Sequence, residues 1–166
     1  VLSAEHYGVP QRRRRTIIVG NRLGYDYEFP KPIHGDRDKL LPYVTVGDVF
    51  AAISIHAKNH DLKSAEIKNK TDYERISLIP EGKAVRYHHD EIEYWGKKKK
   101  LWLDIDWSKV TENHRLRESQ YHRLDRKSVS PTIMTGRYTY YHPVENRHLT
   151  CREAASIMSF QDSFVF

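Results

Sequence analysis

The chain has 166 residues, enough for one domain or one and a half, and its hydrophobic fraction of 39% with 11% aromatic residues excludes a disordered segment. Lysine and arginine exceed aspartate and glutamate by 28 to 22, and this net charge of +6 favours a polyanionic partner, nucleic acid before any other. A single cysteine excludes an internal disulfide framework and no stretch reaches the roughly 18 apolar residues of a membrane span, so we expect a cytoplasmic protein with no membrane partner.

The first segment, residues 1–24, is typical of the end of a larger sheet unit. Pro10 favours extended backbone around it, and the β-branched run of residues 16–19 predicts a buried strand. Residues 25–44 are rich in proline and have no period, which predicts a linker. The chain begins at Val1 inside what reads as a strand, and we therefore expect a piece of something longer or one subunit of a split protein.

The middle of the chain combines predicted helices with a segment in which aromatic and charged residues alternate. Thr45 and Asp48 form a capping-box pattern that predicts a short helix over VGDVFAAIS, and residues 64–79 predict a second, more polar helix. Residues 85–107 alternate aromatic with charged side chains, which predicts short strands. The four lysines at 97–100 are compatible with a solvated turn and equally with a loop that grips phosphates.

The last segment carries the clearest helix signal. Thr150 and Glu153 form a capping box, and Ala154, Ile157 and Met158 then fall on one face at helical spacing. This apolar face predicts a helix that packs on the sheet of the same unit.

Four consecutive arginines lie in the stretch PQRRRRTIIVG. In an extended segment the side chains alternate, so Arg13 and Arg15 share one face while Arg12 and Arg14 share the other. A charge run of this kind is often only a solvated surface or a localisation signal. One pair that points into a cleft would instead hold a carbonyl or phosphate oxygen with a fork that never loses its charge.

The flanking residues decide between these readings. VLSAEHYGVPQRRRRTIIVGNR resembles the eighth conserved motif of DNA cytosine-5 methyltransferases, and Gln11, Arg13 and Arg15 fall on its Gln-x-Arg-x-Arg pattern. RHLTCREAASIMSFQDSF, residues 147–164, is similar to the ninth motif, although Gln161 replaces the family's proline. Between them, YHRLDRKSVSPTIMTGRYTYYHP resembles part of the target-recognition region. The resemblance covers nearly all of the chain.

The resemblance implies a chemistry and a set of roles. Enzymes of this family flip a cytosine out of the duplex, attack its C6 with a cysteine thiolate and pass a methyl group from S-adenosylmethionine to C5. Arg15 would steady the cytosine carbonyl, with Arg13 beside it and Gln11 shaping the turn. Thr132 would contact a phosphate beside the flipped nucleotide. The implied DNA contacts are Thr132, Ile133, Gly136, Arg137 and Tyr138, together with Gln120 and Arg123.

Several family features are absent from the sequence. The family nucleophile sits in a Pro-Cys pair, whereas Cys151 follows a threonine and matches a variable position of the ninth motif. Glu145 and Asn146 precede an arginine and so do not form the catalytic Glu-Asn-Val. No two glycines are spaced as Gly-x-Gly, so S-adenosylmethionine would be bound by another part. Among the ten histidines only His88 and His89 are adjacent, and we expect no metal site.

These observations predict an α+β chain. It would comprise a small, mostly antiparallel β target-recognition domain with packed helices, plus the last strands of a Rossmann-like catalytic domain. The expected parts are residues 1–24 as the end of the catalytic domain, 25–44 as a hinge, 45–148 as the recognition domain and 149–166 as its supporting helix. Alone, such a chain would contact double-stranded DNA without methylating it.

Two readings of the function stay open. The first is the recognition half of a DNA cytosine-5 methyltransferase that works with the remaining methyltransferase domain or subunit, alongside a possible cognate restriction endonuclease. The alternative is a catalytically silent DNA-binding or regulatory module that keeps the methyltransferase frame.

Overall fold

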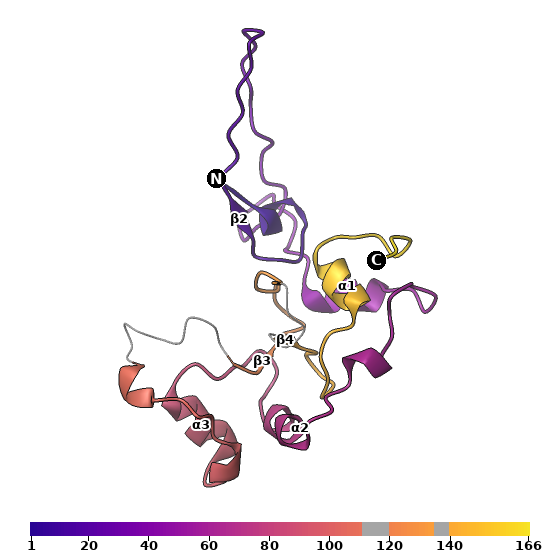
Figure 1. Cartoon of the computed structure of the whole chain (residues 1–166). Helices are drawn as coiled ribbons and strands as arrows, with labels where there is room; N and C mark the ends of the chain where they lie inside the picture. The colour runs from indigo at the N-terminus through magenta and orange to yellow at the C-terminus, as the bar shows by residue number, and fades with distance from the viewer. Residues whose placement is uncertain (111–119, 135–139) are drawn as a thin grey trace.

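The computed structural model describes residues 1–110, 120–134 and 140–166. Helices and strands are short and are joined by long irregular segments (Figure 1). In chain order they are β1 Leu2–Ser3, the 3₁₀ turn η1 Ala4–Tyr7, β2 Arg14–Arg15, α1 Val46–Ala52, η2 Lys63–Ala65, α2 Lys70–Ser77, α3 His88–Trp95, η3 Lys99–Leu101, η4 Trp107–Lys109, β3 His122–Arg123, β4 Tyr140–Tyr141 and α4 Cys151–Ile157.

The β structure is smaller than the sequence predicts. Strands β1 and β2 pair antiparallel, whereas β3 and β4 in the predicted recognition domain pair parallel. Three isolated bridges of that domain, Glu66–Arg147, Val85–Gln120 and Tyr141–His148, are antiparallel. The prediction of short strands at residues 85–107 is wrong, because Glu91 and Trp95 lie four apart and both face inward from helix α3.

The two capping boxes are confirmed. The Asp48 amide donates to Thr45 Oγ1 over 3.2 Å and the Thr45 amide donates back to the Asp48 carboxylate over 2.8 Å, which begins α1. Thr150 and Glu153 form the same pair of bonds at the start of α4. Helices α1 and α4 lie against each other in Figure 1, so α4 packs on a helix, while Tyr140 of β4 packs against the core that the two helices share.

Two apolar cores hold the described residues between 45 and 166, which we call the body. The first centres on α2, α3 and β4, and its buried members are Ile76, Ile79, Val85, Trp95, Leu101 and Tyr141. The second joins α1 to α4 through Val46, Leu124 and Ile157. The predicted helix over 64–79 is interrupted, because Asn69 caps a new helix by accepting from the amides of Thr71 and Asp72.

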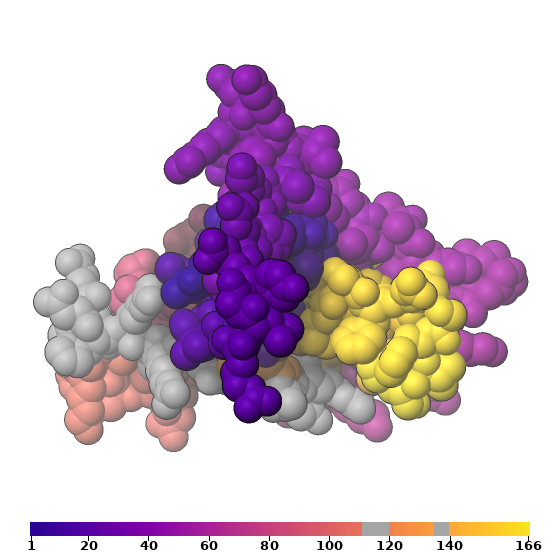
Figure 2. Space-filling view, turned by 90° about the horizontal axis from the view of Figure 1, so that it is seen from above, coloured from indigo at the N-terminus to yellow at the C-terminus, as the bar shows by residue number. Residues whose placement is uncertain are grey.

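Residues 16–33, which we call the arm, leave the body altogether (Figure 1). The sequence predicts a buried strand at 16–19, but Ile17, Ile18 and Val19 are 47%, 90% and 45% exposed. That prediction is wrong for the described residues, which leave all three side chains exposed. Figure 2 looks down on the molecule, and the indigo and violet residues of this region stand in front of the remainder. The end of the arm rejoins the first segment of the chain, where the amides of Ile33 and His34 donate to the His6 carbonyl.

Candidate functional site

The arginine segment is joined to the Thr132 segment by backbone hydrogen bonds. The Ser130 amide donates to the Pro10 carbonyl over 2.9 Å and the Arg12 amide donates to the Ser130 carbonyl over 2.7 Å. The Thr132 hydroxyl then donates to the Arg12 carbonyl over 2.8 Å. Residues distant in sequence, predicted separately as active-site and DNA-contact groups, are therefore brought together at one place.

The four arginines divide between two faces, as the alternation predicts. Arg12 and Arg14 line one hollow of about 360 Å³ together with Ser3, Glu5 and His6. Neither Arg13 nor Arg15 lines this hollow, which agrees with the opposite face assigned to them.

Arg13 and Arg15 differ in how the chain holds them. The Arg13 backbone is tied on both sides, because its amide donates to the Glu5 carboxylate and its carbonyl accepts from the Ala4 amide. Its side chain is half-buried, whereas that of Arg15 is exposed and donates through Nη1 to the Arg14 carbonyl over 2.7 Å. Among the described residues no carboxylate forms an ion pair with either guanidinium.

Gln11 lies deepest in this segment. Its side chain is 1% exposed, and its Nε2 has no hydrogen-bond partner among the described residues. A buried donor without an acceptor costs about 1–3 kcal/mol, so a further carbonyl or carboxylate placed here would stabilise the segment.

The Thr132 segment is held from the body side. The Tyr140 hydroxyl donates to the Thr132 carbonyl over 3.1 Å, and Ile133 packs against the core that joins α1 to α4. The Thr132 hydroxyl hydrogen is engaged by the Arg12 carbonyl, so a contact with phosphate requires that bond to exchange. The predicted contacts Gly136, Arg137 and Tyr138 lie outside the described residues.

Arg123 occupies a different place from the DNA contact that the sequence suggests. It is 4% exposed, and its guanidinium donates to the carbonyls of Ile76 and Ile79 at the end of α2. The remaining acceptors are the carbonyls of His142 and Glu145 and the side-chain oxygen of Asn146. A guanidinium that already serves five acceptors inside the body is poorly placed to reach DNA, so we assign Arg123 to internal support.

Gln120 lies at the surface instead. Its backbone exchanges two hydrogen bonds with Val85, of 2.8 and 2.9 Å, and its exposed side chain lines a cavity of the body. The lysine run is partly engaged within the chain, because Lys98 and Lys100 both pair with Glu74.

Two arginines of the ninth motif form buried polar contacts in the body, and the sequence-based interpretation missed their role. Arg147 donates to both carboxylate oxygens of Glu153 over 2.7 Å. Burial alone would raise the pKa of Glu153, but the hydrogen bonds from Arg147 and from the Thr150 amide outweigh it and lower that pKa. Arg152, which is fully buried, donates to the carbonyls of Lys58, Gln161 and Phe164. The available signal in the sequence was the pair of charged residues, Arg152 and Glu153, in the first turn of an otherwise apolar helix.

Other kinds of site find no support in the described part of the chain. It contains no group of three histidine, cysteine, aspartate or glutamate side chains that would hold a metal ion. Cys151 has no disulfide partner and is exposed. None of the described helices is long and apolar enough to cross a membrane.

Comparison with known proteins places this geometry in a family. The sequence model of C-5 cytosine-specific DNA methylases matches residues 1–166. The chain is 32% identical over 179 residues to the type II methyltransferase M.NgoFVII of Neisseria gonorrhoeae, covering 100% of this chain and 41% of that protein. It is 34% identical over 166 residues to the putative type II methyltransferase M.MJ0563P of Methanocaldococcus jannaschii, covering 100% of this chain and 41% of the relative.

A further relative is the type II methyltransferase M.BbvI of Brevibacillus brevis, which is 34% identical over 168 residues and covers 98% of this chain and 39% of its own length. No solved structure matches the chain. The chain thus spans about two fifths of the length of these curated relatives. With a family match over its whole length, this chain belongs to the C-5 cytosine-specific DNA methylases.

Proposed function

We propose that this chain is the target-recognition part of a DNA (cytosine-5-)-methyltransferase and supplies an active-site arginine to a reaction completed by another part of the enzyme. The observation that carries the proposal is the pairing of Pro10 and Arg12 with Ser130, continued by the Thr132 hydroxyl on the Arg12 carbonyl. A cytosine beside Arg15 would therefore lie close to the segment that holds the DNA strand.

Arg15 would act on the flipped cytosine. When a thiolate adds to C6, negative charge develops toward the carbonyl oxygen of the ring, and a guanidinium stabilises that charge without transferring a proton. Arg13 would sit beside it, fixed by its backbone bonds to Ala4 and Glu5. Gln11 would shape the turn that aims both arginines.

The catalytic domain would include residues 1–24, with residues 25–44 as the hinge, 45–148 as the recognition domain and 149–166 as the supporting helix. The exposed apolar side chains of the arm support this division, since an apolar segment that the described residues leave exposed is stabilised when another layer covers it. The unpartnered amide of buried Gln11 supports it too.

S-adenosylmethionine, the methyl donor of the family, would be bound outside this chain. No two glycines of the sequence are spaced as Gly-x-Gly, the pattern of a glycine-rich loop that would cradle such a cofactor, and this absence supports the proposal.

DNA contact would come from Thr132 and Ile133, from Gly136, Arg137 and Tyr138 in the adjoining residues, and from Gln120. Arg123 is left out of the interface because its donors serve the body. Because several relatives are named type II methyltransferases, we also propose that the complete enzyme belongs to a restriction-modification pair and protects DNA from a cognate endonuclease.

The test is methyl transfer with labelled S-adenosylmethionine and duplex DNA. The complete gene product should methylate cytosine at C5, whereas this chain should do so only after a fragment that carries the Pro-Cys and Glu-Asn-Val motifs is added. Transfer by this chain alone would contradict the proposal. A complete gene that lacks both motifs would instead favour a silent DNA-binding module.

A further inference from the structure

The proposed reaction leaves one face of the arginine segment unused, and this face lines the hollow of about 360 Å³. Arg12 and Arg14 both line it, and both residues are exposed. No carboxylate of the described residues forms an ion pair with either side chain. Two guanidiniums that share a concave surface favour an anionic occupant.

The backbone around this hollow is held in place. Ser3 pairs with Arg14 across β1 and β2. The Arg12 amide donates to the Ser130 carbonyl, and the Arg12 carbonyl accepts from the Thr132 hydroxyl. Both guanidiniums therefore project from a main chain that is already ordered, which reduces the entropy lost when a partner binds.

One carboxylate of the chain itself lies in the hollow. Glu5 is 8% exposed, and its two oxygens accept from the Ser3 hydroxyl over 3.2 Å and from the Arg13 amide over 3.4 Å. Two arginines thus stand against one glutamate, and the hollow has a surplus of one positive charge when His6 is neutral. That surplus suits a single carboxylate better than a row of phosphates.

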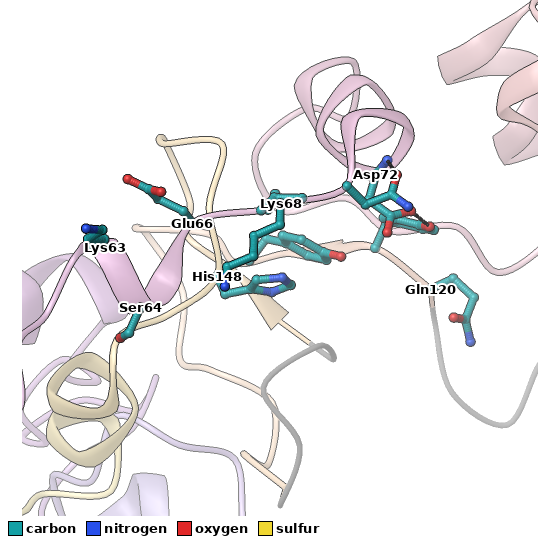
Figure 3. Close-up of a pocket in the computed structure, with 11 residues that line it drawn as sticks. Lys63, Ser64, Glu66, Lys68, Asp72, Gln120 and His148 are labelled. Atoms are coloured by element: carbon teal, nitrogen blue, oxygen red, sulfur yellow. Dashed lines mark hydrogen bonds between the residues drawn. The ribbon is translucent and has the colours of Figure 1, made fainter.

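The larger cavity of the body has a different charge pattern (Figure 3). Lys63 and Lys68 line this cavity of about 630 Å³ together with Glu66 and Asp72. Its two lysines are matched by two carboxylates. The positive surplus is therefore a property of the hollow at the arginine segment and is not shared by every concave surface of this basic chain.

The position of the hollow favours a protein side chain over DNA. Arg13 and Arg15, which the proposed function directs at the flipped cytosine, do not line it. Ile17 and Ile18 follow β2 closely and are exposed. A polar rim beside an apolar patch is the usual arrangement of a protein interface. The hollow and the start of the arm together have this arrangement.

We propose that the hollow of Arg12 and Arg14 receives a carboxylate side chain from the remaining part of the methyltransferase. The inference rests on the proposed function and adds to it a contact between the two parts of the enzyme. An arginine fork can bind both oxygens of a carboxylate at once. Because the Arg12 carbonyl also accepts from Thr132, this ion pair would hold the Thr132 segment at a fixed position relative to the remaining part.

The first experiment is photo-crosslinking in the complete enzyme. The photoreactive residue p-benzoylphenylalanine replaces Arg14 or Arg12, with and without duplex DNA, and mass spectrometry identifies the attached peptide. Ile55, which is 92% exposed in the body, is the control position. Positions 14 and 12 should attach to one acidic peptide of the remaining part in both conditions, and position 55 should not attach to it.

The second experiment varies the charge at position 14 of the complete enzyme. Arg14→Lys keeps the charge, Arg14→Gln removes it and Arg14→Glu reverses it, so the fall in the thermal midpoint should increase in that order. In the Arg14→Glu background, replacing the crosslinked acidic residue with lysine should restore most of the midpoint.

DNA binding separates a carboxylate partner from a phosphate partner. Arg14→Gln should leave the slope of log K against log salt concentration unchanged for duplex DNA. A phosphate on Arg14 would instead make that slope smaller by about 1 in this variant.

Attachment of positions 12 and 14 to DNA, or to nothing outside residues 1–166, would overturn the inference. Equal thermal midpoints in Arg14→Lys and Arg14→Glu, or a reduced salt slope in Arg14→Gln, would overturn it too. All of these outcomes leave the proposed function intact, because none is read through methyl transfer. Absence of methyl transfer by the wild-type complete enzyme would overturn the proposed function, and the crosslinks would still decide the contact.

Discussion

The body and the arm treat their side chains in opposite ways. The body buries charged groups, among them Arg123, Arg147 and Arg152, and gives each guanidinium several acceptors. The arm leaves large apolar groups in water, with Ile18 at 90% and Tyr25 at 75% exposure. Buried charge is stable only where the surrounding hydrogen bonds are complete, and exposed apolar surface of this extent is stabilised by a partner. The comparison indicates a body held together by its own cores and buried hydrogen bonds and an arm that has neither among the described residues.

The strongest way to break the body is to remove one member of its buried ion pair. Arg147→Ala should destabilise this chain by about 3–5 kcal/mol, because it leaves the Glu153 carboxylate buried without its counter-charge. Arg126→Ala is the matched control: Arg126 pairs with Glu81 but is largely exposed, and its loss should destabilise the chain far less. Urea unfolding measures both, and equal losses would contradict the assignment of Arg147.

Arg15 tests the function of the segment from which the arm begins. In the complete enzyme Arg15→Ala should reduce methyl transfer by about 10²–10³-fold, the usual effect of removing a group that stabilises charge in the transition state. Arg14→Ala removes the neighbouring exposed arginine of β2 and should have a far smaller effect. Initial rates with labelled S-adenosylmethionine compare the two, and equal losses would reduce the stretch to a plain basic patch.

The pH dependence of stability tests how far His122 is shielded from water in the body. Burial, and secondarily the charge of Arg86, lowers the pKa of His122 to about 4. The unfolded chain therefore binds a proton on His122 more readily than the folded chain does. Above about pH 6.5 His122 is neutral in both states and does not lower the free energy of unfolding. As the pH falls from 6.5 toward 4, protonation of the unfolded chain lowers the free energy of unfolding. Between pH 7 and pH 5 the loss should be about 2 kcal/mol in urea unfolding.

His122→Gln should remove the part of this pH dependence that His122 supplies, whereas His142, whose pKa is also lowered by burial, should still supply its own part. His89→Gln, which changes a largely exposed histidine, should preserve it. A titration that is identical in wild type and His122→Gln would show that His122 is not the group responsible.

The smallest change in stability is expected for a substitution in the arm of the isolated chain. Ile18→Ser should change the stability of this chain by no more than about 0.5 kcal/mol, because Ile18 contacts so little of it. In the complete enzyme the same change should cost about 1.5–3 kcal/mol if another layer covers the side chain. Ile55, which is 92% exposed in the body, supplies the control, since Ile55→Ser should be neutral in both proteins. A neutral Ile18→Ser in the complete enzyme would contradict a covered arm.

Local features of the fold could be predicted from the sequence. The capping boxes at Thr45 and Thr150 depend on residues three positions apart, and both helices begin where these boxes place them. The alternation of the arginines is equally local, and Arg12 and Arg14 do share one hollow. The wrong prediction of strands at residues 85–107 also came from a local pattern. Aromatic and charged residues alternate there with the period of a strand, and only the packing of Trp95 into the core selects a helix.

By itself the sequence determined the family, through the Gln-x-Arg-x-Arg and ninth-motif residues, and the starts of its best-capped helices. The tertiary structure decided which charges serve the fold and which remain at the surface. Arg123 and Gln120 read alike in the sequence, yet one is surrounded by carbonyls from distant segments and the other faces a cavity. It likewise decided that Arg12 meets Ser130 and Thr132. Burial and long-range hydrogen bonding depend on residues brought together from the whole chain, and no local pattern encodes them.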